Sequence, residues 1–137
     1  MQFKRFLNRA GVILLAAAVL GFFGLGPTAN ASMLGSILYF DNNQSIIHLA
    51  LAIIALASAR FNYEPIHRYL TAALGVIAIS VTAYSFYRVG APSPNLFVAN
   101  VETPWESLIY LGFGLWALWA VLMPPGPIFV KDDLAKP

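Results

Sequence analysis

Cysteine is absent from the 137-residue chain, and charged side chains are scarce. Without cysteine the chain has no disulfide, no cysteine-ligated zinc site and no iron–sulfur cluster. Charged residues make up 10% of the sequence, whereas an ordinary soluble domain has about 25%. The eight basic residues are spread along the chain and form no patch, which excludes a nucleic-acid-binding protein. The low charge also excludes a disordered chain.

The sequence is instead rich in long apolar runs. Hydrophobic residues make up 59% of the chain, and four runs approach the length of about 20 residues that a transmembrane helix needs. Proline, glycine or charged residues follow each run, and no run alternates with period two, which favours helices over a β-barrel. The sequence therefore predicts an all-α integral membrane four-helix bundle, one domain over residues 1–137, with spans at about 10–26, 43–59, 69–87 and 104–123.

The basic residues predict how this bundle is oriented. Seven of the eight would lie on one side of the membrane, namely Lys4, Arg5, Arg9, Arg60, Arg68, Lys131 and Lys136. Arg88 alone would lie on the other side. Because cytoplasmic loops of membrane proteins are enriched in lysine and arginine, we expect both termini in the cytoplasm.

The first span has a second interpretation. Its basic start, its apolar stretch and the Ala29-Asn30-Ala31 sequence before Ser32 also fit a cleaved signal peptide over residues 1–31. Cleavage would leave three spans. However, the uncharged run from Ala10 to Thr28 is longer than the about 7–15 residues of a typical signal-peptide core. A retained helix also completes a four-helix bundle, so we expect the first span to be retained.

Two of the spans are similar to each other. Residues 44–56 and 106–118 match at an offset of 62, with five identities in thirteen positions. The polar residues at the start of each segment coincide, because Gln44 aligns with Glu106 and His48 aligns with Tyr110. Since both spans would run in the same direction, we predict two similar helix pairs in a parallel repeat.

Two motifs carry a resemblance to a known family. The stretch Leu34–Asp41 leads into Gln44-Ser45-Ile46-Ile47-His48, and Asn100 leads into Glu106–Gly112. This order resembles the bacterial membrane proteins grouped as domain of unknown function 4383, over most of residues 8–122. The resemblance implies a four-helix protein of the bacterial inner membrane or an equivalent membrane, and it implies no biochemical activity.

The chain departs from that family's pattern at three positions. The family has an N-x-x-H motif at the start of its second span and a similar motif at its fourth. Here Ser45 and Ser107 stand where the family tends to have asparagine, and Tyr110 stands where it tends to have a second histidine. A role that requires two histidines is therefore not expected in this chain.

The polar side chains within the spans are the candidate site. Gln44 and His48 lie four residues apart and hence on one face of the second helix, and Glu106 and Tyr110 have the same spacing on the fourth. In the predicted orientation all four lie in the outer leaflet. One interpretation is an interhelical hydrogen-bond cluster that fixes the register of the helices.

Small residues beside this cluster support the structural interpretation. We expect these residues to let the helix backbones approach each other: Ala50, Ala52, Gly112 and Gly114. The other interpretation of the cluster is a site for a small ligand or a proton, with His48 and Glu106 as its titratable groups.

The number and placement of histidines limit which cofactor the chain could bind. His48 and His67 are the two histidines of the chain, and they would lie on opposite sides of the membrane, which excludes a haem held by two histidines of one chain. A single haem or pigment ligated by His48 remains an alternative. No spacing of ligand residues indicates a metal site.

The sequence contains no catalytic motif. It has no H-E-x-x-H sequence, no phosphate-binding glycine loop and no serine–histidine arrangement, so we do not expect an enzyme. The expected function is that of a structural or accessory subunit without cofactor, which associates in the lipid bilayer with other membrane subunits or with itself. The alternative is a ligand-, pigment- or haem-binding module that uses His48.

Overall fold

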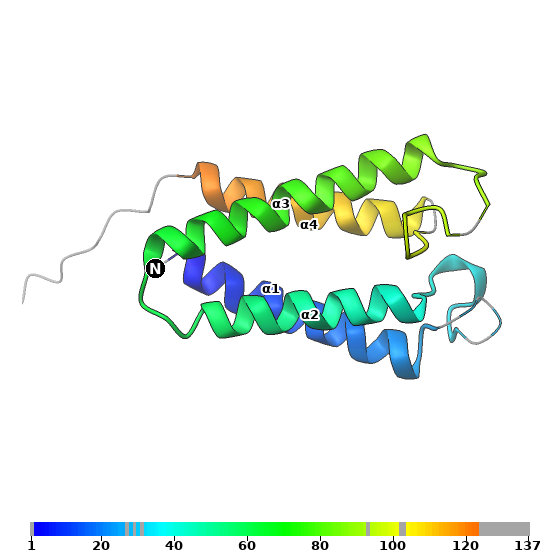
Figure 1. Cartoon of the computed structure of the whole chain (residues 1–137), viewed down its shortest axis with the longest axis horizontal. Helices are drawn as coiled ribbons and strands as arrows, with labels where there is room; N and C mark the ends of the chain where they lie inside the picture. Colours follow the sequence, from blue (N-terminus) through cyan, green and yellow to red (C-terminus); the bar gives the residue numbers. More distant parts are fainter. Residues whose placement is uncertain are drawn as a thin grey trace, which may run out of the picture.

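The computed structural model of the chain describes residues 2–26, 28, 30, 32–92, 94–101 and 104–123. Within these residues the protein is all-helical, with α1 (Gln2–Phe23), a one-turn helix η1 (Gly35–Ile37), α2 (Asn42–Ser58), α3 (Glu64–Tyr87) and α4 (Trp105–Leu122). The four long helices alternate in direction (Figure 1). The predicted all-α four-helix bundle is therefore confirmed.

Two helices begin earlier than the sequence predicts. α1 starts at Gln2 and α3 at Glu64, because apolar runs reveal only the apolar part of a helix and not its polar first turns. Pro65 lies in the first turn of α3. Proline is tolerated there because the N–H that it lacks has no partner in a first turn. Pro104 lies just before α4, as its N-cap.

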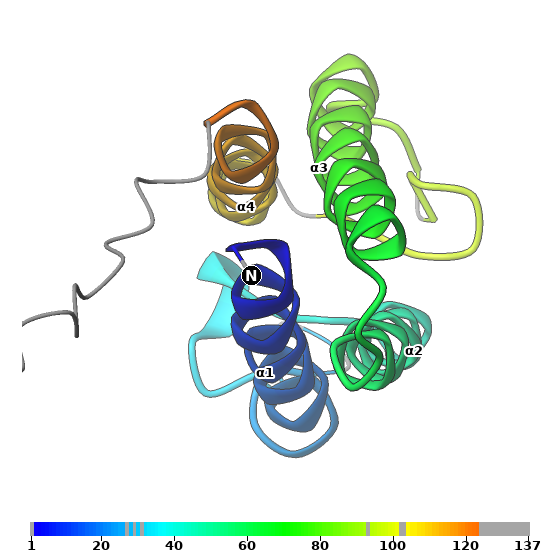
Figure 2. The same ribbon diagram turned by 90° about the vertical axis from the view of Figure 1, so that its left-hand side faces the viewer.

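The bundle consists of two helical hairpins. α1 packs along α2, and α3 packs along α4, while contacts between the hairpins are sparser. Seen end-on, the four helices stand at the corners of a quadrilateral (Figure 2). The apolar core that joins the hairpins includes Phe6, Leu7, Leu74 and Ala117. The ring of Phe6 lies 4.5 Å from that of Trp116, so the hairpins meet closely at the end where α1 begins.

The two hairpins repeat the same pattern of burial. Buried positions of α1 recur in α3 64 residues later, and those of α2 recur in α4 62 residues later. The matching pairs are Leu7 and Thr71, Ala10 and Leu74, Gly11 and Gly75, Leu14 and Ala78, Ala18 and Thr82, Gly21 and Ser85, Gln44 and Glu106, Ser45 and Ser107, Ala52 and Gly114, and Ala55 and Ala117. The predicted parallel repeat thus extends to the packing of the helices.

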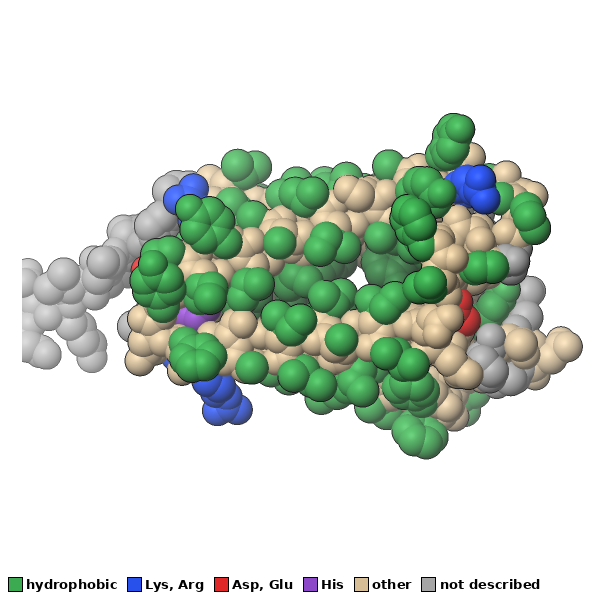
Figure 3. Space-filling view, in the orientation of Figure 1, with side chains coloured by type: hydrophobic (Ala, Val, Ile, Leu, Met, Phe, Trp, Pro, Cys, Tyr) green, Lys and Arg blue, Asp and Glu red, His purple; other side chains and the backbone are tan. Residues whose placement is uncertain are grey.

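Large apolar side chains cover the outside of the bundle (Figure 3). The exposed ones include Val12, Val19, Leu20, Ile53, Ile54, Val76, Leu115 and Trp119. In the described part of the chain, three helices are long and apolar enough to cross a membrane: α1, α3 and α4. α2 is apolar but has 17 residues, or about 26 Å at 1.5 Å per residue.

Candidate functional site

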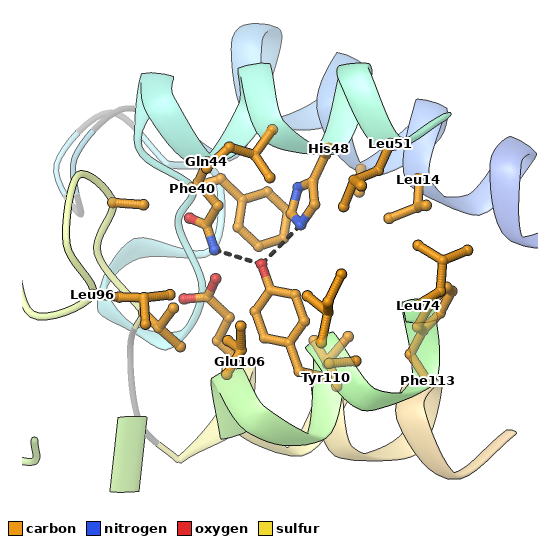
Figure 4. A pocket seen from close by; sticks show the side chains of 18 of the residues that line it. Leu14, Phe40, Gln44, His48, Leu51, Leu74, Leu96, Glu106, Tyr110 and Phe113 are labelled. Carbon is orange, nitrogen blue, oxygen red and sulfur yellow. Dashed lines mark hydrogen bonds between the residues drawn. The ribbon is translucent and has the colours of Figure 1, made fainter. Parts of the chain in front are cut away.

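The four polar residues singled out in the sequence lie together between the hairpins (Figure 4). Gln44 Nε2 lies 2.9 Å from the Tyr110 hydroxyl oxygen, and His48 Nε2 lies 2.8 Å from the same oxygen. Gln44, His48 and Glu106 are buried. We call these four residues, Gln44, His48, Glu106 and Tyr110, the polar cluster. Its hydrogen bonds join α2 to α4, as the interhelical interpretation predicts.

Hydrogen bonds connect three members of the cluster. Gln44 Nε2 donates to the Tyr110 hydroxyl oxygen. The same hydroxyl is hydrogen-bonded to His48 Nε2, and the tautomer of His48 sets which of the two donates. Among the described residues, neither His48 Nδ1 nor Gln44 Oε1 has a hydrogen-bond partner, although both atoms are buried. The cluster therefore has two buried polar atoms whose hydrogen-bonding capacity is unused.

Glu106 enters the cluster from the first turn of α4. A carboxylate is favoured in the first turn of a helix because the N-terminal end of the helix dipole is positive. The side chain is 1% exposed and points toward the amide of Gln44 in Figure 4. Glu106 is the repeat counterpart of Gln44, so the two counterparts face each other across the boundary between the hairpins.

The start of α2 is held by Asp41 and by a segment before α4. Asp41 Oδ1 caps α2 by accepting from the backbone N–H of Gln44 at 2.7 Å. Asp41 Oδ2 accepts from the backbone N–H of Asn100 at 2.5 Å. Residues 94–101, which we call the cap loop, are thereby fastened over the polar cluster. The cap loop is held internally by two hydrogen bonds between Asn95 and the backbone of Val101.

A second polar layer lies within the α3–α4 hairpin. Ser85 Oγ and Ser107 Oγ are 2.7 Å apart, and Thr82 Oγ1 donates to the backbone oxygen of Ser107 at 3.2 Å. The sequence reasoning did not single out Thr82 and Ser85. Their spacing of three residues on one helix face was the available signal.

A cavity of about 180 Å³ lies beside the polar cluster. All four helices and the cap loop contribute to its wall. Its apolar part includes Leu14, Ala17, Leu51, Leu74, Ile77 and Phe113. Each residue of the polar cluster also lines it, at one end. The sequence reasoning did not find this cavity, because it forms where two hairpins that are distant in sequence fail to close on each other.

The small residues near the cluster divide into two pairs. Ala52 and Gly114 are buried, and a Cβ at Gly114 would meet Ile79 Cγ1 at 2.7 Å. Ala50 and Gly112 are exposed, so the prediction that they allow close approach of the helices was wrong. A shift of two residues turns a helical side chain by about 200°, which places the two pairs on opposite faces.

The second histidine lies at the other end of the bundle. His67 is in the first turn of α3, and its Nε2 donates to the backbone oxygen of Ser58 at the end of α2, at 2.9 Å. His48 is near the start of α2, so the two histidines are separated along the bundle as the sequence indicated. Over the described ranges, no three His, Cys, Asp or Glu residues group as metal ligands.

Comparison of the chain with family models, with curated proteins and with solved structures found no match. The resemblance to domain of unknown function 4383 therefore stays a prediction.

Proposed function

We propose that this chain is an integral membrane protein that binds a small lipophilic molecule between its two hairpins, without catalysis of its own. The observation that carries this proposal is the cavity, which is apolar along its length and polar at one end. Binding pockets for small molecules have this character, with mostly apolar walls and a few polar groups that orient the ligand.

The outer surface supports the membrane location. Soluble monomers rarely expose large continuous apolar surfaces, whereas apolar side chains cover the helices here. Aromatic side chains stand exposed near the helix ends, with Tyr69 and Trp105 close to helix starts and Tyr87 at a helix end. Tyrosine and tryptophan at these positions are typical of the membrane–water interface.

The basic residues support an orientation with the start of α1 in the cytoplasm. Of the basic residues that the structure describes, five lie at one end of the bundle: Lys4, Arg5 and Arg9 in the early turns of α1, Arg60 after α2 and Arg68 early in α3. Arg88 follows the end of α3 and lies at the opposite end. Lys131 and Lys136 lie outside the described residues, so the cytoplasmic C-terminus remains part of the proposal.

The absence of native cysteine allows a clean test of this orientation. We expect Val89→Cys to react with a membrane-impermeant maleimide on intact cells, and Asn62→Cys to react only after the membrane is opened. Both side chains are exposed, at opposite ends of the bundle. The reverse labelling pattern would contradict the orientation, and labelling of both variants on intact cells would contradict the membrane location.

Retention of α1 is also part of this proposal. α1 contributes Phe6, Leu7 and Ala10 to the core that joins the hairpins, and Leu14 and Ala17 to the cavity wall. Cleavage between Ala31 and Ser32 would remove all five. Ala29 and Ala31 lie outside the described residues. The packing of α1 favours a mature protein that keeps it.

Binding is tested with fluorobenzene, an apolar ring that fits the cavity. An apolar cavity of about 150 Å³ accommodates benzene, so a cavity of about 180 Å³ has room for this probe. We expect a saturable bound signal in fluorine NMR of the purified protein in detergent. Ala17→Leu places a larger side chain in the cavity wall and should abolish that signal. The neighbouring Ala16 is exposed, so Ala16→Leu is the matched control and should bind normally.

The second candidate is a structural or accessory subunit. The hydrogen bonds that Tyr110 makes with Gln44 and His48 join the hairpins without any ligand, which is what a purely structural cluster would do. A saturable signal that Ala17→Leu removes favours the binding module. If neither fluorobenzene nor a hydroxylated ring of the same size binds saturably to the unaltered, folded protein, the binding proposal is overturned and the structural one is left.

A haem or pigment at His48 is a poorer fit to the same site. His48 Nε2, the ring nitrogen farther from the backbone, already contacts the Tyr110 hydroxyl at 2.8 Å, and Nδ1 is buried. The cavity of about 180 Å³ is also below the roughly 300–1,000 Å³ of typical cofactor and drug pockets. We therefore propose a ligand of one ring rather than a macrocycle.

A further inference from the structure

The cavity lies between the two hairpins of the internal repeat, and equivalent residues of both line it. Its lining residues come in repeat pairs, one from each hairpin: Ile13 and Ile77, Leu14 and Ala78, and Ala17 and Val81 from α1 and α3. α2 and α4 contribute Gln44 and Glu106, Ile47 and Ile109, and His48 and Tyr110. The apolar pairs keep their character. The polar pairs differ in chemistry, so the polar end of the cavity is asymmetric and can orient a ligand.

The cavity is reached from the side of the bundle between α2 and α3. Ile47 on α2 and Ile77 on α3 line it, yet they are 41% and 49% exposed on the outer surface. Figure 3 shows a hollow in the bundle between these two helices. Their repeat counterparts, Ile109 and Ile13, also line the cavity and are exposed. The hollow between α2 and α3 is bordered by apolar side chains, which suits entry of an uncharged molecule from the lipid.

The polar cluster indicates which polar group the ligand carries. Gln44 Oε1 is a buried acceptor that lacks a donor among the described residues, and an unpaired buried acceptor is unfavourable. The Gln44 amide nitrogen and the Tyr110 hydroxyl are already used by each other, so what Gln44 Oε1 itself requires is a donor. A hydroxyl group supplies one and is small enough for a cavity that already has to hold a ring.

We infer that the ligand of this cavity is an uncharged, ring-sized molecule with a hydroxyl group, of the phenol class, which enters from the bilayer and donates its proton to Gln44 Oε1. This inference rests on the proposed function, because it assigns the ligand class of the same cavity. It explains why the apolar body of the cavity ends at a glutamine with an unused oxygen, which a cluster serving only to join the hairpins does not require.

The test compares para-fluorophenol, para-fluoroanisole and fluorobenzene by fluorine NMR with the purified full-length protein in detergent. The first two probes differ in that the hydroxyl proton is replaced by a methyl group. We expect para-fluorophenol to bind roughly five- to tenfold more tightly than para-fluoroanisole, which corresponds to one hydrogen bond. Partition of each probe into protein-free micelles is measured separately and subtracted.

Variants locate the source of this preference. Gln44→Leu removes the acceptor at similar size and should bring the two affinities within about twofold of each other. Asn42 is exposed at the start of α2, so Asn42→Leu is the matched control and should keep the preference. Should Gln44→Leu fail to fold, the comparison of para-fluorophenol with para-fluoroanisole in the unaltered protein still decides whether the hydroxyl matters.

The possible outcomes separate the two proposals. A preference for para-fluorophenol that depends on Gln44 supports the inference. Saturable binding of all three rings with equal affinity, or a preference that Gln44→Leu leaves intact, overturns the assigned ligand class while the binding function stands. No saturable binding of any ring overturns the proposed function and this inference with it.

Discussion

Gly114→Leu is expected to lower the apparent Tm of the purified protein by roughly 5–10 °C, whereas Gly112→Leu leaves it nearly unchanged. Both substitutions put the same side chain on the same helix, two residues apart. At Gly114 even the first added carbon would lie 2.7 Å from Ile79 Cγ1 and 3.1 Å from the backbone oxygen of Gly75. At Gly112 no atom beyond its chain neighbours and the backbone of its own helix lies within 4 Å of the added carbon.

The size of this effect follows from what surrounds Gly114. The backbone of α3 cannot move aside as a flexible side chain can, so the leucine must push α3 and α4 apart. Overpacking of this kind costs about 1–3 kcal/mol, and each kcal/mol shifts Tm by a few degrees in a protein of this size. The repeat counterpart of Gly114 is Ala52, which is fully buried, so the α1–α2 hairpin has room for a Cβ at this position. Equal Tm values for the two leucine variants would contradict the packing of α4 on α3.

Tyr110→Phe is expected to destabilise the protein by about 2–3 kcal/mol, because it removes one oxygen and leaves two buried groups without it. Gln44 Nε2 and His48 Nε2 both contact the Tyr110 hydroxyl. Because phenylalanine keeps the ring, the loss of stability measures the contribution of the Tyr110 hydroxyl group. Tyr69 is 75% exposed, and Tyr69→Phe is the matched control, expected to change stability by less than about 0.5 kcal/mol.

A double variant separates the hydrogen bond from packing. Each single substitution leaves the other group of the Gln44–Tyr110 hydrogen bond buried without its partner. Combining Gln44→Leu with Tyr110→Phe removes both groups, so the loss of stability should be smaller than the sum of the two single losses. Chemical unfolding in detergent measures all three variants. Additive losses, or a Tyr110→Phe protein as stable as Tyr69→Phe, would show that the cluster does not join the hairpins.

Much of the candidate site followed from helical spacing. Gln44 and His48 lie four residues apart, as do Glu106 and Tyr110, which places each pair on one face of a helix. The internal repeat indicated that both faces are equivalent, and the structure brings all four residues together. The same reasoning misplaced Ala50 and Gly112, because residue size alone does not distinguish the buried face of an apolar helix from its outer face.

The scarcity of charge and the high hydrophobic content favoured a membrane protein without coordinates, and the membrane location stays part of the proposal. The apolar runs determined that it forms four helices, and the repeat determined that the helices form two similar pairs. These features are local, because they depend on the order and spacing of residues along one helix. Only the tertiary structure decided that Gly114 rather than Gly112 faces α3, that residues 94–101 cover the polar cluster, and that a cavity separates the hairpins beside Tyr110. Each of these depends on the distance between segments far apart in the sequence, and side-chain packing sets that distance.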